Sequence, residues 1–215
     1  MKTIAVLGSG QVGQVLADGF LARGDHVMRG SREPAKLADW KARAGARAAT
    51  GTFAEAARFG GIVVLAVKGL AAESVIDLCG PGALDGKVVI DATNPIAETP
   101  PVNGVLAFFT TLDQSLMERL QVRVPAARFV KAFSCVGNAL MIDPRLKGGP
   151  PTMFICGNDP AAKAEVRGIL DGFGWETEDL GAAEAARAIE PLCILWCIPG
   201  LQGHGWMHAL KMLRA

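Results

Sequence analysis

The amino-acid sequence predicts an α/β fold: a Rossmann-type, doubly wound and mostly parallel β-sheet, followed by a short helical C-terminal appendage. Two observations support this prediction. Short, continuously apolar runs recur along the chain, and each is followed by a segment with apolar residues at helical spacing. A glycine-rich turn also follows the first apolar run, where a parallel βαβ unit makes its first strand-to-helix connection.

The first strand is expected at residues 3–7, and a helix with Val12, Leu16 and Phe20 on its apolar face follows and ends at Gly24. Further strands are expected at residues 26–28, 47–49, 62–67, 87–91, 128–133, 152–156 and 176–180. Further helices are expected around Leu37 and Trp40, at 53–59, 70–79 and 112–121, from Pro160, and from Ala182 to the end of the chain.

The length of 215 residues suits one compact unit with a sizeable core. We expect residues 1–180 to form the sheet domain and residues 181–215 to form a helical segment that belongs to the same unit. Residues 92–110 break the alternation with several prolines. Long irregular segments inside compact domains are more often functional than idle.

Composition narrows the classes of partner. Half of the residues are apolar, a fifth are charged and the net charge is +1, so neither a nucleic acid nor a membrane surface is an expected partner. The most apolar late run, residues 192–198, is far shorter than the ~20 residues of a membrane span. No export leader precedes the first strand, and the five cysteines include no CxxC pair. We therefore expect a cytoplasmic protein with free thiols.

Missing residue types exclude some chemistries. The chain has no tyrosine, which excludes a short-chain dehydrogenase with a Tyr-Lys proton donor, and it has only three histidines. His204 and His208 have the spacing of two zinc ligands on a helix, but Gly203 and Gly205 interrupt that helix and no third ligand is near. No metal site is expected.

The glycine-rich turn has the pattern GxGxxG in the context that gives it meaning, after a buried-type strand and before an amphipathic helix. In such turns the glycines permit a tight turn, close approach of a pyrophosphate and close packing of helix on strand. The helix N-terminus offers free N–H groups to the phosphates. The turn predicts a dinucleotide site that includes Gly8, Ser9, Gly10, Gln11, Val12 and Gly13.

The end of the second strand favours NADP(H) over NAD(H). NAD sites place an acidic residue there to bind the ribose hydroxyls, whereas this chain has Ser31 and Arg32, with Lys36 one helical turn later. Hydroxyl and cationic donors suit a 2′-phosphate, which a carboxylate would repel. The alternative is that Arg32 is an ordinary solvated loop residue, and the adjacent Glu33 weakens the charge argument.

The nicotinamide half is expected across the carboxyl ends of the strands, where the strand order reverses. Asn94 or Ser134 could orient the carboxamide or the hydride acceptor, or both could simply cap strand ends. The remaining cofactor-binding candidates are Ala66, Val67, Lys68, Ala92 and Asn94. The candidates for binding the acceptor are Ser134, Cys135, Val136 and Trp196.

Two further interpretations concern side chains near the expected acceptor site. Cys135 is the one thiol near the expected site, although packing in the core is its commoner role. The helix that carries Trp196 is apolar nearly all round, which favours a part in closing the acceptor site and in forming a homodimer.

Several segments together resemble a known family. Residues 8–13, 30–32, 160–170 and 187–213 resemble the NADP-dependent reductases of coenzyme F420, a deazaflavin. Residues 130–133 resemble the cytoplasmic reductase domain of the STEAP metalloreductases. The resemblance implies direct hydride transfer between NADP(H) and a stacked small-molecule acceptor, either coenzyme F420 or a flavin such as FMN or FAD. It also implies a homodimer and no protein acid or base that carries the chemistry.

One departure and two alternatives remain open. Ser134 stands where the archaeal deazaflavin enzymes are expected to have a histidine, so the acceptor is not fixed by the resemblance. A reductase of a small imine or carbonyl compound is the second enzymatic hypothesis, but those families carry a long helical substrate domain and only residues 181–215 remain here. A non-catalytic NADP(H)-sensing module is the third hypothesis, because fold alone does not prove turnover.

Overall fold

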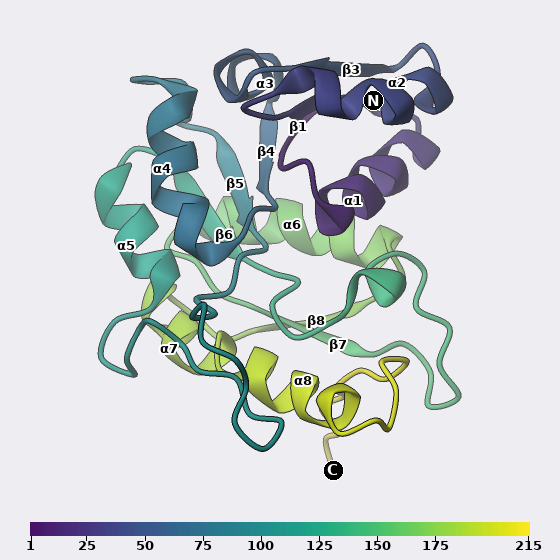
Figure 1. Ribbon diagram of the computed structural model, residues 1–215, viewed down its shortest axis with the longest axis vertical. Helices are drawn as coiled ribbons and strands as arrows, with labels where there is room; N and C mark the ends of the chain where they lie inside the picture. The colour runs from purple at the N-terminus through teal and green to yellow at the C-terminus, as the bar shows by residue number, and fades with distance from the viewer.

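The computed structural model describes residues 1–215 and has a six-stranded, all-parallel sheet at its centre (Figure 1). Its strands are β1 (Thr3–Leu7), β2 (His26–Gly30), β3 (Ala48–Gly51), β4 (Ile62–Leu65), β5 (Val88–Asp91) and β6 (Arg128–Lys131). They are ordered β3-β2-β1-β4-β5-β6, so the order reverses between β1 and β4. This is the doubly wound Rossmann topology that the sequence predicts.

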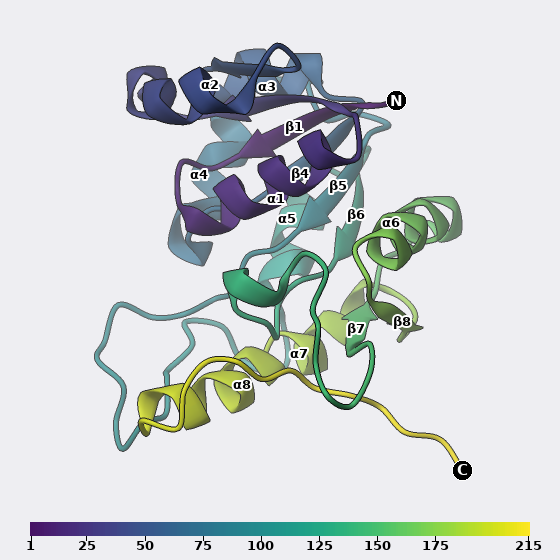
Figure 2. The ribbon, with the colours of Figure 1, turned by 90° about the vertical axis from the view of Figure 1, so that its right-hand side faces the viewer.

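Helices cover both faces of the sheet, with α4 and α5 on one side and α1 and α6 on the other (Figures 1 and 2). The α-helices are α1 (Gln11–Ala22), α2 (Ala38–Ala44), α3 (Phe53–Phe59), α4 (Gly69–Cys79), α5 (Leu116–Arg123), α6 (Pro160–Gly172), α7 (Ala186–Ile189) and α8 (Leu192–Leu201). Three short 3-10 turns are η1 (Pro34–Leu37), η2 (Asn138–Leu140) and η3 (Ala183–Ala185).

Side-chain alternation along the strands builds two separate cores. Ile4 and Val6 of β1 join the core that contains α1 and α6, while Ala5 and Leu7 join the core that contains α3, α4 and α5. The central strands β1 and β4 are apolar on both faces because both faces are buried, which is why their sequences read as continuous apolar runs.

The last two strands form a sheet of their own. β7 (Thr152–Ile155) and β8 (Glu176–Asp179) pair in parallel, and one antiparallel bridge between Lys131 and Cys156 joins them to β6. The helix α6 connects them and begins as the sequence predicts, with the side chain of Asp159 capping its N-terminus and Pro160 in its first turn.

Two expected helices differ from the structure. The helix expected at 112–121 begins at Leu116, because Ser115 and Glu118 form a capping box. The helix expected to reach the chain end stops at Leu201, and the tail that follows is not helical. The tail instead lies along β7, where the Thr152 amide donates to the Leu210 carbonyl at 2.9 Å (Figure 2).

The tail contains both histidines that the sequence places at zinc-ligand spacing. They are not on a helix, since Gly203 and Gly205 both adopt positive φ. The His208 ring stacks on Trp196 with ring centroids 5.1 Å apart.

None of the helices combines the length and the apolar character that a bilayer crossing requires.

A buried ion cluster joins the sheet to the C-terminal segment. The Lys131 ammonium lies 2.9 Å from a carboxylate oxygen of Asp91, 3.0 Å from one of Glu190, and 2.6 Å from the Thr93 carbonyl. All three charged side chains are almost completely buried. Burial alone would lower the pKa of Lys131, but the two carboxylates raise it above its ordinary value. The lysine is therefore charged.

Glu190 also holds α5 in place. Its carboxylate accepts hydrogen bonds from the backbone amides of Leu116 and Met117, each at 3.0 Å, in the first turn of α5. The negative charge lies at the positive end of the helix dipole. One turn earlier in the C-terminal segment, the Arg187 guanidinium binds Glu118 of α5 and lowers the pKa of that carboxyl to about 2.

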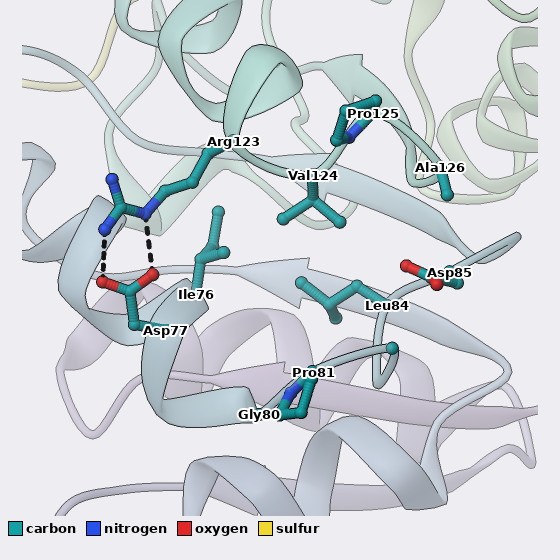
Figure 3. A pocket seen from close by; sticks show the side chains of 11 residues that line it. Ile76, Asp77, Gly80, Pro81, Leu84, Asp85, Arg123, Val124, Pro125 and Ala126 are labelled. Carbon is teal, nitrogen blue, oxygen red and sulfur yellow. Dashed lines mark hydrogen bonds and ion pairs between the residues drawn. The ribbon is translucent and has the colours of Figure 1, made fainter.

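A cavity of about 460 Å³ lies at the end of the sheet opposite to the buried ion cluster (Figure 3). The segments that precede β5 and β6 line it, so it opens at the amino ends of these strands. Arg123 of α5 forms a bidentate ion pair with Asp77 of α4 at its edge (Figure 3). Ligands of open α/β sheets bind at the carboxyl ends, and this cavity therefore belongs to the packing of α4 against α5.

We predict that Lys131→Met lowers the free energy of unfolding by about 3–5 kcal/mol, because two buried carboxylates lose their shared cation. Chemical denaturation of both proteins measures the difference. Lys2→Met is the control, since the ion pair of Lys2 with Glu165 is half exposed and its loss costs at most about 1 kcal/mol. Equal losses for the two variants would contradict the role given to the buried cluster.

Candidate functional site

The turn after β1 is shaped by two close backbone contacts. Gly8 has a φ of 152°, and a Cβ there would lie 2.2 Å from the carbonyl oxygen of Ala66. A Cβ at Gly13 would lie 2.7 Å from the carbonyl oxygen of Gly8. These two glycines are required by the protein's own packing, of β1 against the end of β4 and of α1 against the turn.

Gly10 has no such structural requirement. A Cβ there would meet nothing within 4 Å, and the φ of −77° is open to any residue. Gly10 is also the N-cap of α1, and no side chain accepts a hydrogen bond from the first turn of that helix. The empty space lies where a phosphate could approach free helix N–H groups, as the pyrophosphate of a dinucleotide would. The turn fits such a group.

A cleft of about 340 Å³ lies on one side of the turn and contains the residues expected to bind a 2′-phosphate. Ser31, Arg32 and Lys36 all line it. The Lys36 ammonium forms an exposed ion pair with Glu33 at 2.7 Å, whereas Arg32 forms no ion pair. Five further lining residues were not among the expected binding residues: Glu33, Phe53, Ala71, Ser74 and Val75.

A second cleft of about 320 Å³ continues on the other side, towards the ends of β4 and β5. Val67 and Lys68 line both clefts, so the two clefts adjoin each other. The expected residues Val12, Ala92 and Asn94 line the second cleft. Gly69 brings its walls together, since a Cβ there would lie 2.1 Å from the Asn94 carbonyl oxygen.

The ends of β5 and β6 are joined by a hydrogen bond. The Asn94 side-chain amide donates to the Ser134 carbonyl at 2.9 Å. Phe133, just before Ser134, has a φ of 62°, a strained conformation for a bulky residue and one that clusters at functional sites. Two buried polar atoms have no partner here, the Oδ1 of Asn94 and the Oγ of Ser134. Buried polar atoms are rarely left without partners, and a bound polar ligand is one way to supply them.

The other residues expected to bind the acceptor are buried within the chain. Cys135 belongs to the core that contains α3, α4 and α5, and Val136 belongs to the core that contains α1 and α6. Burial raises the pKa of the Cys135 thiol to about 12. Trp196 is 7% exposed and packs on Gly137, where a Cβ would lie 2.6 Å from the indole. Trp206 of the tail covers Trp196 and is itself 43% exposed.

The side chain of Arg29, in β2, contacts the turn through hydrogen bonds. Arg29 was not among the site residues expected from the sequence. Its Nη2 donates to the carbonyl oxygens of Gly8 at 3.2 Å and Gly10 at 3.1 Å. The available signal was a charged residue inside an otherwise buried strand, because such a residue must find partners.

The fold and the two joined clefts define a class: a Rossmann-type protein whose sheet carries a dinucleotide-binding edge. A family model described as "NADP oxidoreductase coenzyme F420-dependent" matches residues 3–95, which include the turn, Arg32 and Asn94. The chain belongs to this family of coenzyme F420-dependent NADP oxidoreductases. It is an NADP-dependent oxidoreductase, and NADP(H) is its cofactor.

Solved structures and a curated relative agree with the family. A protein from Arthrobacter sp. FB24, proposed to be an F420-dependent NADP reductase, is 30% identical, covers both chains fully and has a TM-score of 0.92. Rat metalloreductase STEAP3 is 30% identical over 94% of this chain, which spans only 39% of that relative's length. A reductive aminase from Aspergillus terreus, in complex with NADPH and ethyl levulinate, has 20% identity and a TM-score of 0.68 over 95% of this chain and 63% of its own. That likeness concerns the fold.

We predict that Gly10→Val leaves the fold intact but weakens NADPH binding at least about a hundredfold, because the side chain fills the space beside the α1 N-terminus. Calorimetric titration with NADPH and thermal unfolding measure the two effects. Gly13→Val is the matched control, and its clash with the Gly8 carbonyl should destabilise the fold itself. A stable Gly10→Val protein with unchanged NADPH affinity would show that the turn is structural only.

Proposed function

We propose that this protein transfers a hydride between NADP(H) and a deazaflavin, coenzyme F420, with a flavin such as FMN or FAD as the alternative acceptor. The observation that carries the proposal is a pair of adjoining clefts beside an unfilled glycine turn, with two buried polar atoms without partners, of Asn94 and Ser134, at the nearby ends of β5 and β6. Membership of the F420-dependent family supports the choice of acceptor.

The turn, the two clefts and the strand ends each have a proposed role in binding. The residues from Gly8 to Gly13 hold the pyrophosphate, and Ser31, Arg32 and Lys36 bind the 2′-phosphate. Val67, Lys68 and Ala92 line the nicotinamide half, where the Oδ1 of Asn94 accepts from a carboxamide and the Oγ of Ser134 faces carboxamide or acceptor. NADP(H), when bound, supplies or receives the hydride. The hydride passes directly between two stacked rings, and the proton that completes the reduced acceptor comes from water, so no protein acid or base is required.

The C-terminal segment is proposed to border the acceptor. Trp196 supports the segment that contains Ser134, Cys135 and Val136 through its contact with Gly137. We further propose that the chain works as a homodimer in the cytoplasm, and its five cysteines, all free thiols, are compatible with a reducing compartment.

An assay of NADPH consumption across acceptors tests the proposed function. Turnover with F420 at least tenfold faster than with FMN, FAD or a cyclic imine supports a deazaflavin oxidoreductase. Fast turnover with FMN or FAD alone would replace the deazaflavin by a flavin. Turnover with the imine alone, or tight NADPH binding without turnover on any acceptor, would contradict the proposal.

We predict that Arg32→Ala weakens NADPH binding by about 1.5–3 kcal/mol, the usual loss for one charged hydrogen-bonded contact, and leaves NADH binding almost unchanged. Titration with each cofactor measures both values. Lys36→Ala should cost less, because Lys36 already pairs with Glu33. Equal losses for NADPH and NADH in Arg32→Ala would contradict binding of the 2′-phosphate by this residue.

We predict that Leu195→Glu converts a dimer into monomers at micromolar concentration. Leu195 is 55% exposed on α8, and Val102, Val105 and Leu201 are also exposed apolar residues of α8 and the 92–110 segment. A buried carboxylate in such an interface would have no partner. Light scattering measures the mass, and Val122→Glu, on the exposed side of α5, is the control. A wild-type monomer would overturn the proposed dimer.

A further inference from the structure

Arg29 is a charged residue at an interior position of the main sheet. It pairs in register with Val6 of β1 and Thr50 of β3, and its side chain is among the largest that are fully buried. Burying an arginine is costly unless its charge and its N–H groups find partners. The partners of Arg29 therefore indicate why the chain keeps a cation there.

Those partners belong to the phosphate-binding turn and its supports. Nη2 donates to the carbonyl oxygens of Gly8 and Gly10, at 3.2 and 3.1 Å. The guanidinium carbon lies 4.9 Å from the centre of the Trp40 ring, and the Trp40 indole donates to Asp18 of α1 at 2.7 Å. One side chain thus links the turn to α1 and to α2.

The positive charge of Arg29 is only partly compensated inside the protein. No carboxylate forms an ion pair with it, and the Nε group is buried without a hydrogen-bond partner. Burial lowers the pKa of Arg29, which measures the cost of keeping it charged, and Asp18 opposes that shift from a distance. A buried cation in this state gains stability when an anion binds close by.

We propose that Arg29 is a positioning residue for the pyrophosphate of the cofactor. Its hydrogen bonds to the Gly8 and Gly10 carbonyls fix the backbone of the turn that would receive the pyrophosphate, and the pyrophosphate completes the compensation of its charge. The inference rests on the proposed role of the Gly8–Gly13 turn. It differs in kind from the proposed role of Arg32, because NADPH and NADH share the pyrophosphate and only NADPH has the 2′-phosphate.

Calorimetric titration of Arg29→Met and Arg29→Lys with NADPH and with NADH tests the proposal. Arg29→Met should raise both dissociation constants by the same factor, about tenfold for a lost charge near the phosphates. Arg29→Lys keeps the charge and should recover most of the affinity for both cofactors. Arg32→Ala is the matched control, in which only the NADPH constant should rise.

Several results would overturn the proposal. A folded Arg29→Met protein with unchanged constants would do so, and so would a loss confined to NADPH, which would place Arg29 on the 2′-phosphate. Failure of Arg29→Lys to recover affinity would reduce Arg29 to a structural role. If Arg29→Met does not fold, Arg29→Gln replaces it with the same expected pattern. A wild-type protein that binds neither cofactor would end the proposed function as well, whereas the other results leave that function intact.

Discussion

Lys131 carries the charge on which the arrangement of the site depends. Asp91 at the end of β5 and Glu190 between α7 and α8 share its ammonium, and all three side chains are buried. Removal of the ammonium would leave two buried acidic side chains without their partner. The Thr93 carbonyl binds the same ammonium, and Thr93 is followed directly by Asn94. The cluster therefore fixes the strand ends that border the second cleft and docks the C-terminal segment beneath them.

The turn after β1 contributes to the site in a different way, because it leaves open space beside Gly10. Gly8 and Gly13 are needed so that the backbone can pack against itself, while Gly10 leaves space that the chain does not fill. The pattern of three glycines thus has two members that the packing of the backbone requires and one, Gly10, that this packing does not require. The neighbouring N-terminus of α1 supplies the N–H groups for that ligand, and the reversal of strand order between β1 and β4 opens the sheet edge at this point.

Much of the fold follows from local sequence patterns. Apolar runs located β1, β4 and β5, and the alternation of strands and helices placed the other strands of the main sheet. The glycine turn and Arg32 predict a cofactor edge from signals that lie within a few neighbouring residues. Contacts between distant residues were not predictable in this way. Charges inside the apolar strands at Arg29, Asp91 and Lys131 showed that partners must exist, but no spacing rule names Glu190 as one of them.

The same limit explains why the sequence predicts the wrong end for the C-terminal helix and the wrong start for α5. Helical propensity favours a helix through the tail, but the positive φ of Gly203 and Gly205 and the pairing of the tail with Thr152 decide its course. The start of α5 was set by Ser115 and Glu118, a signal present in the sequence, and strengthened by Glu190 from far along the chain. Trp196 was expected at the acceptor, and its burial under Trp206 depends on that unforeseen course of the tail.

We propose that this sheet edge brings NADP(H) and a deazaflavin together for direct hydride transfer, with no protein group that exchanges the hydrogen with water. Mass spectrometry of reduced F420 after reaction with NADPH deuterated at either face of nicotinamide C4 tests it directly. We expect deuterium from one face to appear quantitatively in the reduced deazaflavin, in ordinary water. Loss of the label from both substrates to solvent, or reduction without transfer from either face, would contradict it.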